Sequence, residues 1–237
     1  MRVKFKSLDF DLELHPDYVS CLEIHSKTYF SKVILSLISQ MGEEAEEPYF
    51  LFNEAGKSIG VKNKLIIFNS LPLVPAADKK ALSNIWDKVS KDMKLDDDSY
   101  NEFVRLTNRM LEIIRLHSLG MHSDLDFVLE LDEKLVMKCF GFEPNSFNSL
   151  ELVDNLISYF EMLLDSDSVK PIVFVNLKSF LDKNGLEELA ESAFLNKIPL
   201  LLLESSCDLN RYAREEKIVV DQDFIVFDQR KLSGQDA

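Results

Sequence analysis

The stretch that decides the fold is PIVFVNLKSFLDKNGLEELAESAFLNKIPLLLLES, residues 171–205. Two apolar segments, IVFVN and IPLLLLES, have the length of buried strands, and SFLDKNGLEELAESAFLN between them has helical spacing. A strand, a helix and a second strand in immediate succession predict a βαβ crossover, whose two strands are parallel. The stretch therefore predicts an α/β fold.

Segments on both sides of the crossover extend the predicted core. Residues 150–164 are predicted as a helix before it, and KIVV and DFIVF as a closing pair of strands after it. KLIIFN, residues 64–69, is apolar on both faces and is predicted as an internal strand. KTYFSKVILSLISQM carries one apolar stripe and is predicted as a helix capped by Ser26.

Two other regions have different patterns. VKFKSL, FDLEL and YVSCLEI alternate apolar with polar residues near the start, which predicts half-buried strands of a small N-terminal sheet. From Asp78 to about Leu116 the spacing is helical, with a break near LDDDS. We therefore expect a discontinuous α/β core at residues 1–75 and 150–230, with a helical arm or subdomain at 76–149.

Composition limits the functions to be considered. The chain has 237 residues, 46% of them hydrophobic, and a formal net charge of −14. It has no run of about 18 apolar residues, so we expect a cytoplasmic protein without a membrane partner. The cysteines Cys21, Cys139 and Cys207 have no zinc or disulfide spacing and are predicted as small core residues. Net charge does not describe local fields, so a basic surface on an acidic protein stays open.

FNEAGKSIG, residues 52–60, contains the end of a P-loop motif. A complete motif needs an earlier glycine, where this chain has Leu51, and it must open a helix. We therefore predict an exposed turn that carries Lys57. PLLLLES resembles a Walker B strand ending in Glu204, but it has no P-loop partner. Together the two half-motifs suggest a degenerate P-loop-NTPase-like core from which the phosphate chemistry is missing.

Catalytic and metal-binding motifs are sparse. The sequence has no G-x-S-x-G, no H-E-x-x-H and no cysteine with the flanks of a known nucleophile, so no catalytic residue is predicted. A nuclease site made of converging carboxylates stays an open alternative, because the chain has 41 acidic residues. The acids between 124 and 133 suit Ca²⁺, yet they alternate with apolar residues, as on a strand with a solvated face. Both interpretations stay open.

The chain resembles the small ring-forming, DNA-end-binding adaptation proteins of type II-A CRISPR systems. The resemblance rests on the start MRVKF, on LFNEAGKSIGVKNKLIIFNSL at 51–71, on the crossover and on DQDFIVFD at 221–228. Residues 72–148 fit it loosely. It implies a non-catalytic protein that forms homotetrameric rings, binds Ca²⁺ and holds double-stranded DNA ends in a lysine-lined hole. It also implies the CRISPR integrase pair and the RNA-guided nuclease as partners in spacer acquisition.

The resemblance also suggests site residues. Its basic early loop matches Lys57, Lys62 and Lys64, which are the first expected DNA-binding residues. Lys4 and Lys6 of the first strand are also expected to bind DNA. Its calcium region corresponds roughly to residues 119–133, which gives the candidate ligands Asp124, Asp126, Asp132 and Glu133. Two other functions stay open: an ATPase or GTPase with an irregular phosphate loop, and a protein scaffold that does not bind DNA.

Overall fold

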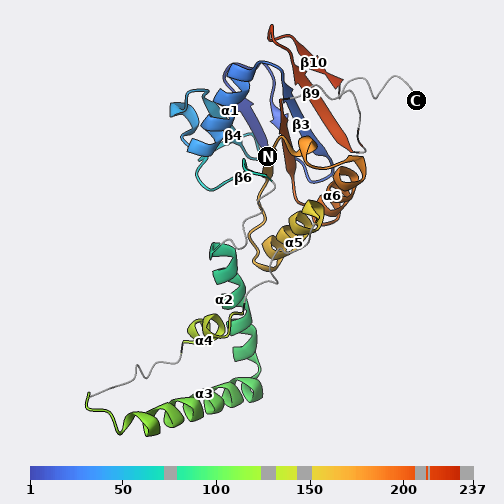
Figure 1. The fold of residues 1–237 in the computed structure, drawn as a ribbon. Helices are drawn as coiled ribbons and strands as arrows, with labels where there is room; N and C mark the ends of the chain where they lie inside the picture. The colour runs from blue at the N-terminus through green and yellow to red at the C-terminus, as the bar shows by residue number, and fades with distance from the viewer. Residues whose placement is uncertain (72–78, 124–131, 143–150, 206–211, 213, 230–237) are drawn as a thin grey trace. The chain divides into compact units, whose positions relative to one another are not determined.

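The chain forms two compact units (Figure 1). The computed structural model describes residues 1–71, 79–123, 132–142, 151–205, 212 and 214–229. The core unit comprises Met1–Ala76, Phe147–Leu164 and Ser168–Ala237, and the helical unit comprises Ala77–Ser146 and Asp165–Asp167.

The core is built on a six-stranded sheet with the order β10-β9-β3-β8-β7-β6. Its strands are β3 (Val19–Ile24), β6 (Ile66–Phe68), β7 (Ile172–Val175), β8 (Leu200–Glu204), β9 (Glu215–Val220) and β10 (Val226–Asp228). All neighbours are parallel except β10, which is antiparallel to β9. The predicted crossover is present, because β7 and β8 pair in parallel and α6 (Lys183–Leu195) connects them. The predicted α/β fold is confirmed.

A second, antiparallel sheet has the order β2-β1-β4-β5. Its strands are β1 (Arg2–Phe5), β2 (Leu12–Glu13), β4 (Tyr49–Phe52) and β5 (Ser58–Ile59). In β1 and β4 the buried side chains alternate with more exposed ones, as the pattern of a half-buried strand requires. This sheet is the predicted small N-terminal sheet.

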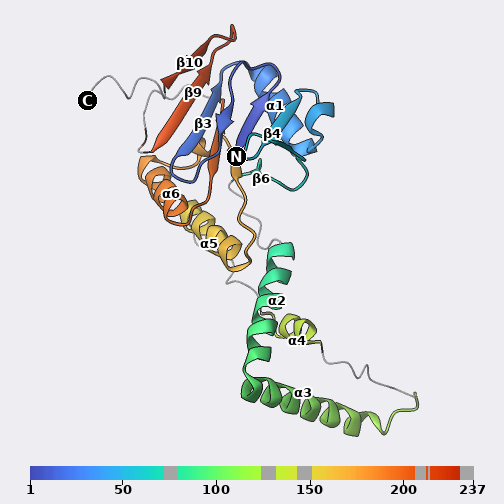
Figure 2. The same ribbon diagram turned by 180° about the vertical axis from the view of Figure 1, so that it is seen from behind.

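The main apolar cluster lies between the two sheets and α1 (Lys27–Ser39). It contains Leu22 and Ile24 from β3, Val33 and Leu37 from α1, and Leu51 from β4, each fully buried. The predicted cap of α1 is confirmed, since the Ser26 hydroxyl accepts a hydrogen bond from the Tyr29 N–H at 3.4 Å. The helices α5 (Leu152–Asp165) and α6 cover the other face of the large sheet (Figures 1 and 2).

The prediction for YVSCLEI was wrong in position. The segment forms β3, which lies at the centre of the large sheet between β9 and β8, and all six of its residues are buried. Its polar residues suggested a half-buried strand, but they have partners inside the protein. The Ser20 hydroxyl donates to the Glu13 carbonyl, and Glu23 forms an ion pair with Lys217. Buried polar groups with such partners are compatible with a central strand.

Two smaller predictions also need correction. KLIIFN was predicted as an internal strand, but β6 is the edge strand of the six-stranded sheet that the described residues form. Cys21 is buried as predicted, whereas Cys139 is exposed at the end of α4 (Glu133–Cys139). Cys207 lies outside the described residues.

The helical unit contains α2 (Lys79–Leu95), α3 (Asp97–Ser118) and α4. The predicted break at LDDDS is present, where Asp96 caps α3 by accepting from the Ser99 N–H. Two contacts join α4 and the residues after it to α2: Lys134 Nζ lies 2.6 Å from Asp87 Oδ1, and Trp86 Nε1 donates to the Phe142 carbonyl at 2.8 Å. None of the described helices is long and apolar enough to cross a membrane.

Candidate functional site

The lysine segment, residues 53–65, connects β4 to β6 and contains Lys57, Lys62 and Lys64. Its first part is a tight hairpin. The Asn53 N–H donates to the Lys57 carbonyl at 3.0 Å, and the Lys57 N–H donates to Oδ1 of Asn53 at 2.9 Å. Gly56 has a φ of +74°, which a glycine adopts without strain. Because the hairpin joins two antiparallel strands, GKS opens no helix, and the predicted exposed turn is confirmed.

A second turn in the lysine segment places the other two lysines. The Lys64 N–H donates to the Val61 carbonyl at 3.2 Å, and the Asn63 N–H donates to Oε1 of Gln40 at 2.8 Å. The three lysines are all exposed. The segment therefore presents three cationic side chains on short, hydrogen-bonded turns.

The start of the chain lies beside the hairpin. Lys4 is exposed on β1, and its Nζ is 3.7 Å from Asp11 Oδ1. Lys6 is exposed just after β1, where its N–H donates to the Pro48 carbonyl. Arg2, which the sequence-based assignment omits, has its guanidinium within reach of Gly56, because a Cβ there would be 3.3 Å from Nη2. The register Arg2↔Phe52 explains this contact and could not be read from the sequence.

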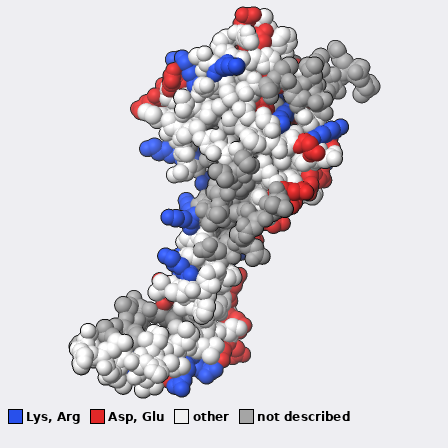
Figure 3. Space-filling model, viewed as in Figure 1, with Lys and Arg blue, Asp and Glu red and all other residues white. Residues whose placement is uncertain are grey.

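Acidic side chains accompany these cations. Arg2 Nη1 lies 3.2 Å from the same Asp11 carboxylate that faces Lys4. On the face shown in Figure 3, basic and acidic side chains of the core are interspersed. The charge of the Arg2 and Lys4 pair is therefore partly neutralised within the chain, and the lysine segment is the stronger candidate for contact with an anion.

The predicted calcium ligands divide into two groups. Asp124 and Asp126 lie outside the described residues. Asp132 caps α4, with its Oδ1 accepting from the Lys134 and Leu135 N–H groups. Glu133 Oε1 lies 2.8 Å from Lys94 Nζ, and this hydrogen bond lowers the pKa of Glu133. Within the part of the chain that the structure describes, no three acidic, histidine or cysteine side chains are grouped to hold a metal ion.

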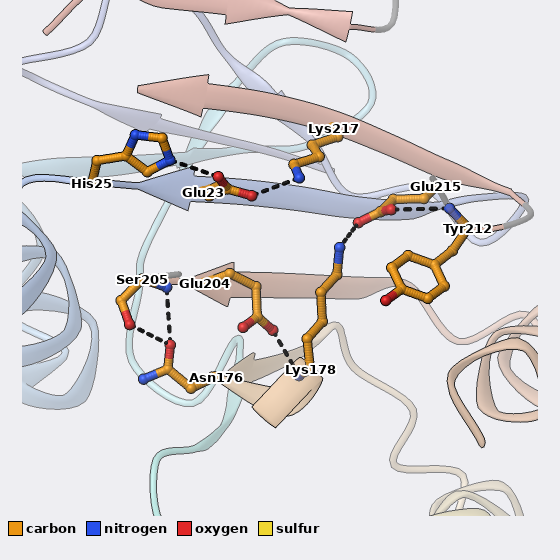
Figure 4. Close-up of polar contacts among 9 residues, drawn as sticks. All are labelled: Glu23, His25, Asn176, Lys178, Glu204, Ser205, Tyr212, Glu215 and Lys217. Atoms are coloured by element: carbon orange, nitrogen blue, oxygen red, sulfur yellow. Dashed lines mark hydrogen bonds and ion pairs between the residues drawn. The ribbon is translucent and has the colours of Figure 1, made fainter. Parts of the chain in front are cut away.

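A layer of buried charge, absent from the sequence-based predictions, lies on the face of the large sheet that α6 covers (Figure 4). It consists of Glu23, Lys178, Glu204, Glu215 and Lys217, each almost completely buried at its charged group. Lys217 Nζ is 2.6 Å from Glu23 Oε2, and Lys178 Nζ is 2.5 Å from Glu215 Oε1. Each lysine thus has a carboxylate partner, as buried charges require.

Glu204 is the member of this layer without an ion-pair partner among the described residues. Its Oε1 accepts from the Lys178 backbone N–H at 3.1 Å, and its Oε2 has no hydrogen-bond partner there. Burial raises the pKa of Glu204 to about 7, despite the opposing effect of Lys178. This carboxyl group, which the sequence likened to a Walker B acid, accepts from a backbone amide and belongs to no group of three metal-ligating side chains among the described residues.

The connection from β3 to α1 occupies the place where an α/β protein carries a phosphate loop, between a parallel strand and a helix. The helix begins with Lys27 and Thr28, which match the last two positions of the P-loop motif. Only His25 and Ser26 precede them after the strand, and neither is glycine. His25 is fixed by its N–H bond to the Val220 carbonyl and by its Nε2, 2.6 Å from Glu23 Oε1. The backbone cradle for phosphate is therefore missing from this connection.

These features define the class of protein: an α/β core with a largely parallel sheet, an exposed lysine segment and a helical unit. At the position of a phosphate loop, this core has a short strand-to-helix connection without glycine. The chain belongs to the family of the CRISPR-associated protein Cas_Csn2, whose family model matches residues 42–224. This membership confirms the resemblance to type II-A adaptation proteins.

The chain is also similar to solved structures. Stu0660 of Streptococcus thermophilus superposes with a TM-score of 0.55 at 14% sequence identity, covering 96% of this chain and 76% of the other. A Pyrococcus furiosus protein assigned as the ATP-binding protein of an ABC transporter gives a TM-score of 0.38 at 11% identity, covering 92% of this chain and 97% of the other. The first likeness supports the fold. No curated protein sequence matches the chain.

Proposed function

We propose that this chain binds double-stranded DNA ends without cutting them, as a homotetrameric ring, during CRISPR spacer acquisition. The observation that carries the proposal is membership of the Cas_Csn2 family over residues 42–224. The exposed lysine segment supplies cations on hydrogen-bonded turns, which can meet phosphates without a change of fold. The partners in this role are the CRISPR integrase pair and the RNA-guided nuclease, in the cytoplasm.

A ring reconciles DNA binding with the net charge of −14. One chain offers few exposed lysines in this segment, but four copies around a common axis direct four such groups toward one duplex. The positive electrostatic potential that these lysines create is local and does not require a protein with a positive net charge. It also explains a preference for ends, because a closed bore admits a linear duplex more readily than a circle.

The proposal includes a bound Ca²⁺ ion, whose ligands come from the acidic region that contains Asp124, Asp126, Asp132 and Glu133. Hard carboxylate oxygens are the donors that Ca²⁺ prefers, and the cation would offset repulsion between acids of neighbouring copies. Light scattering with and without Ca²⁺ tests this part. A tetramer that requires Ca²⁺ is the expected result, and a single chain under every ionic condition would contradict both the ring and its cation.

The variant Lys57→Glu/Lys62→Glu is expected to abolish retention of linear duplex in a gel-shift assay while the assembly keeps its mass. Both side chains are exposed, so the fold tolerates the change, and each lost phosphate contact removes about 0.9 from the slope of log affinity against log salt. The measurement is a salt series of gel shifts with linear and circular duplex.

A matched control is Lys183→Glu/Lys197→Glu, which makes the same change of charge at two exposed lysines of α6 and the turn after it. We expect the control to retain DNA with only the small loss caused by net charge. Equal losses in the two double variants would place the DNA elsewhere. If the parent protein retains neither linear nor circular duplex, the result supports the scaffold function instead.

The nucleotide-hydrolase alternative predicts tight, magnesium-dependent nucleotide binding. We expect no such nucleotide binding, because the short connection between β3 and α1 places no loop before or after Lys27 that could surround phosphates. Titration of the purified protein with ATP and GTP in the presence of Mg²⁺ measures this directly. Micromolar or tighter binding would favour the alternative.

A further inference from the structure

The helix α3 presents an apolar face that the described residues leave uncovered. None of its 22 residues is buried, and Leu106, Met110 and Ile113 are 49%, 51% and 46% exposed. The helix begins beside the end of α2, and most of its length extends away from α2 and α4 (Figures 1 and 2). Helices in proteins owe most of their stability to the packing of an apolar face, so an uncovered face of this kind marks an interaction surface.

The apolar face has the spacing of a coiled-coil seam. Intervals of three and four residues keep its side chains on one side of the helix. The α3 seam consists of Phe103, Leu106, Met110 and Ile113. The helix surface next to the seam is polar and holds two ion pairs. Arg105 Nη2 lies 2.6 Å from Glu102 Oε1, and Arg109 Nη1 lies 2.9 Å from Glu112 Oε2. An apolar seam with a charged flank is the pattern by which one helix packs along another.

The charges of α3 and its cap are divided along the helix. Residues 96–104 contain four acids and no lysine or arginine, which gives this half a net charge of −4. Residues 105–118 contain three arginines and one glutamate, which gives the other half a net charge of +2 with His117 neutral. Two copies of α3 in antiparallel directions place the acidic half of each beside the basic half of the other, whereas parallel copies place like charges together. The helix dipoles also favour the antiparallel direction.

We propose that α3 packs antiparallel against α3 of a second copy of this chain, about a two-fold axis at the level of Asn108. The proposal rests on the assembly of copies in the proposed function and identifies a surface for one of its contacts. With this axis, Leu106 of each copy is opposite Met110 of the other. Phe103 is likewise opposite Ile113, so every residue of the α3 seam meets another seam residue. Such a pair is isologous and closes after two copies.

The sequence of the seam selects this register. If the axis moves half a heptad toward the N-terminus, Ile113 becomes opposite Asp96, the acidic cap of the helix. If it moves half a heptad toward the C-terminus, Leu106 becomes opposite His117. Both shifts place an apolar side chain against a polar one, which costs the desolvation of the polar group. The axis at Asn108 therefore combines the apolar match with the charge match.

The test is disulfide cross-linking between two variants of the full chain, Leu106→Cys and Met110→Cys, each with Cys139→Ser and Cys207→Ser to remove other reactive thiols. The variants are mixed and incubated so that copies exchange, oxidised glutathione is added, and dimer is measured on a non-reducing gel. In the proposed register the two cysteines are at the same level, with their Cα atoms about 6 Å apart, which suits a disulfide. In either variant alone they are about 6 Å apart along the axis as well, which takes them beyond disulfide reach.

The matched control is a mixture of Asn101→Cys and Arg115→Cys on the same background. These two positions are exposed and also opposite each other in the proposed register, but they lie on the sides of the two helices that face away from the seam. We expect most of the mixed Leu106→Cys and Met110→Cys pairs to become covalent, severalfold more than in the control mixture or in either variant alone. No excess over the control overturns the pairing, and equal dimer in each variant alone overturns its antiparallel direction.

A second measurement uses the native mass under conditions in which the parent protein assembles. Leu106→Glu/Met110→Glu places four carboxylates in the seam and should at least halve the mass, whereas Asn101→Glu/Asn108→Glu makes the same change of charge on the far side of the helix and should leave it unchanged. An unchanged mass in the seam variant would contradict the pairing. Neither readout involves DNA, so DNA retention without the cross-link contradicts the pairing alone, and the cross-link without DNA retention contradicts the proposed function alone.

Discussion

Replacing Lys178 by methionine is expected to lower the free energy of unfolding by about 3–5 kcal/mol, the range for a buried ion pair that loses one partner. The Lys178 ammonium group is almost completely buried, lies 2.5 Å from Glu215 and packs 4.5 Å from the ring centre of Tyr212. Methionine has a similar volume and leaves the Glu215 carboxylate buried without its cation. Urea denaturation at pH 8 measures the loss.

Two further variants identify the cause. The double variant Lys178→Met/Glu215→Met removes both charges, and we expect it to recover most of the lost stability, because well-packed apolar residues can replace a buried pair. Lys183→Met, which removes an exposed lysine 3.8 Å from Glu187, should cost at most about 1 kcal/mol. If Lys178→Met costs no more than Lys183→Met, the ion pair does not stabilise the core.

The parts of the fold that local pattern determines could be predicted from the sequence. The crossover at 171–205 combines two apolar strands with a helix that has a polar and an apolar face, and these features depend on neighbouring residues alone. The capping residues Ser26 and Asp96 follow the same rule. The position of β3 could not be predicted, because a strand that carries Ser20 and Glu23 has the same pattern in a half-buried and in a central place.

The buried charge layer depends on contacts between distant residues. Lys178 and Glu215 are 37 positions apart, and Glu215 stands among charged residues that suggest an exposed segment. Their meeting requires the parallel order β9-β3-β8, which the sequence does not specify by itself. The Glu23 and Lys217 pair has the same origin, since β3 and β9 are neighbours only in the folded sheet.

The lysine segment, in contrast to the buried charge layer, is determined by contacts between residues close in sequence. Asn53, Gly56 and Lys57 form a hairpin through contacts within five residues, so an exposed turn at GKS could be predicted. The acids at 132 and 133 show the limit of composition: both have roles in the helical unit, one as a cap and one as the partner of Lys94. An acidic cluster in a sequence therefore indicates affinity for cations without indicating which cation, lysine or metal, is the partner.

Replacing Glu204 by glutamine should stabilise the protein above pH 7. Burial raises the pKa of this carboxyl group from 4.5 to about 7 in the folded protein. The folded state thus binds a proton more tightly than the unfolded state, so the stability due to this group is full below about pH 4.5 and is lost as the pH rises to about 7. The loss corresponds to about 3 kcal/mol. Glutamine keeps an acceptor for the Lys178 N–H and carries no charge at any pH.

We therefore expect Glu204→Gln to exceed the parent in free energy of unfolding by about 3 kcal/mol at pH 8 and to match it near pH 4.5. Denaturant unfolding across this range measures the difference, with the exposed Glu188→Gln as a control that should follow the parent curve. A constant difference at every pH would mean that the two side chains pack differently. A variant less stable than the parent at pH 8 would mean that the charged form of Glu204 has a partner that stabilises it, and that the layer of buried charge requires this carboxylate.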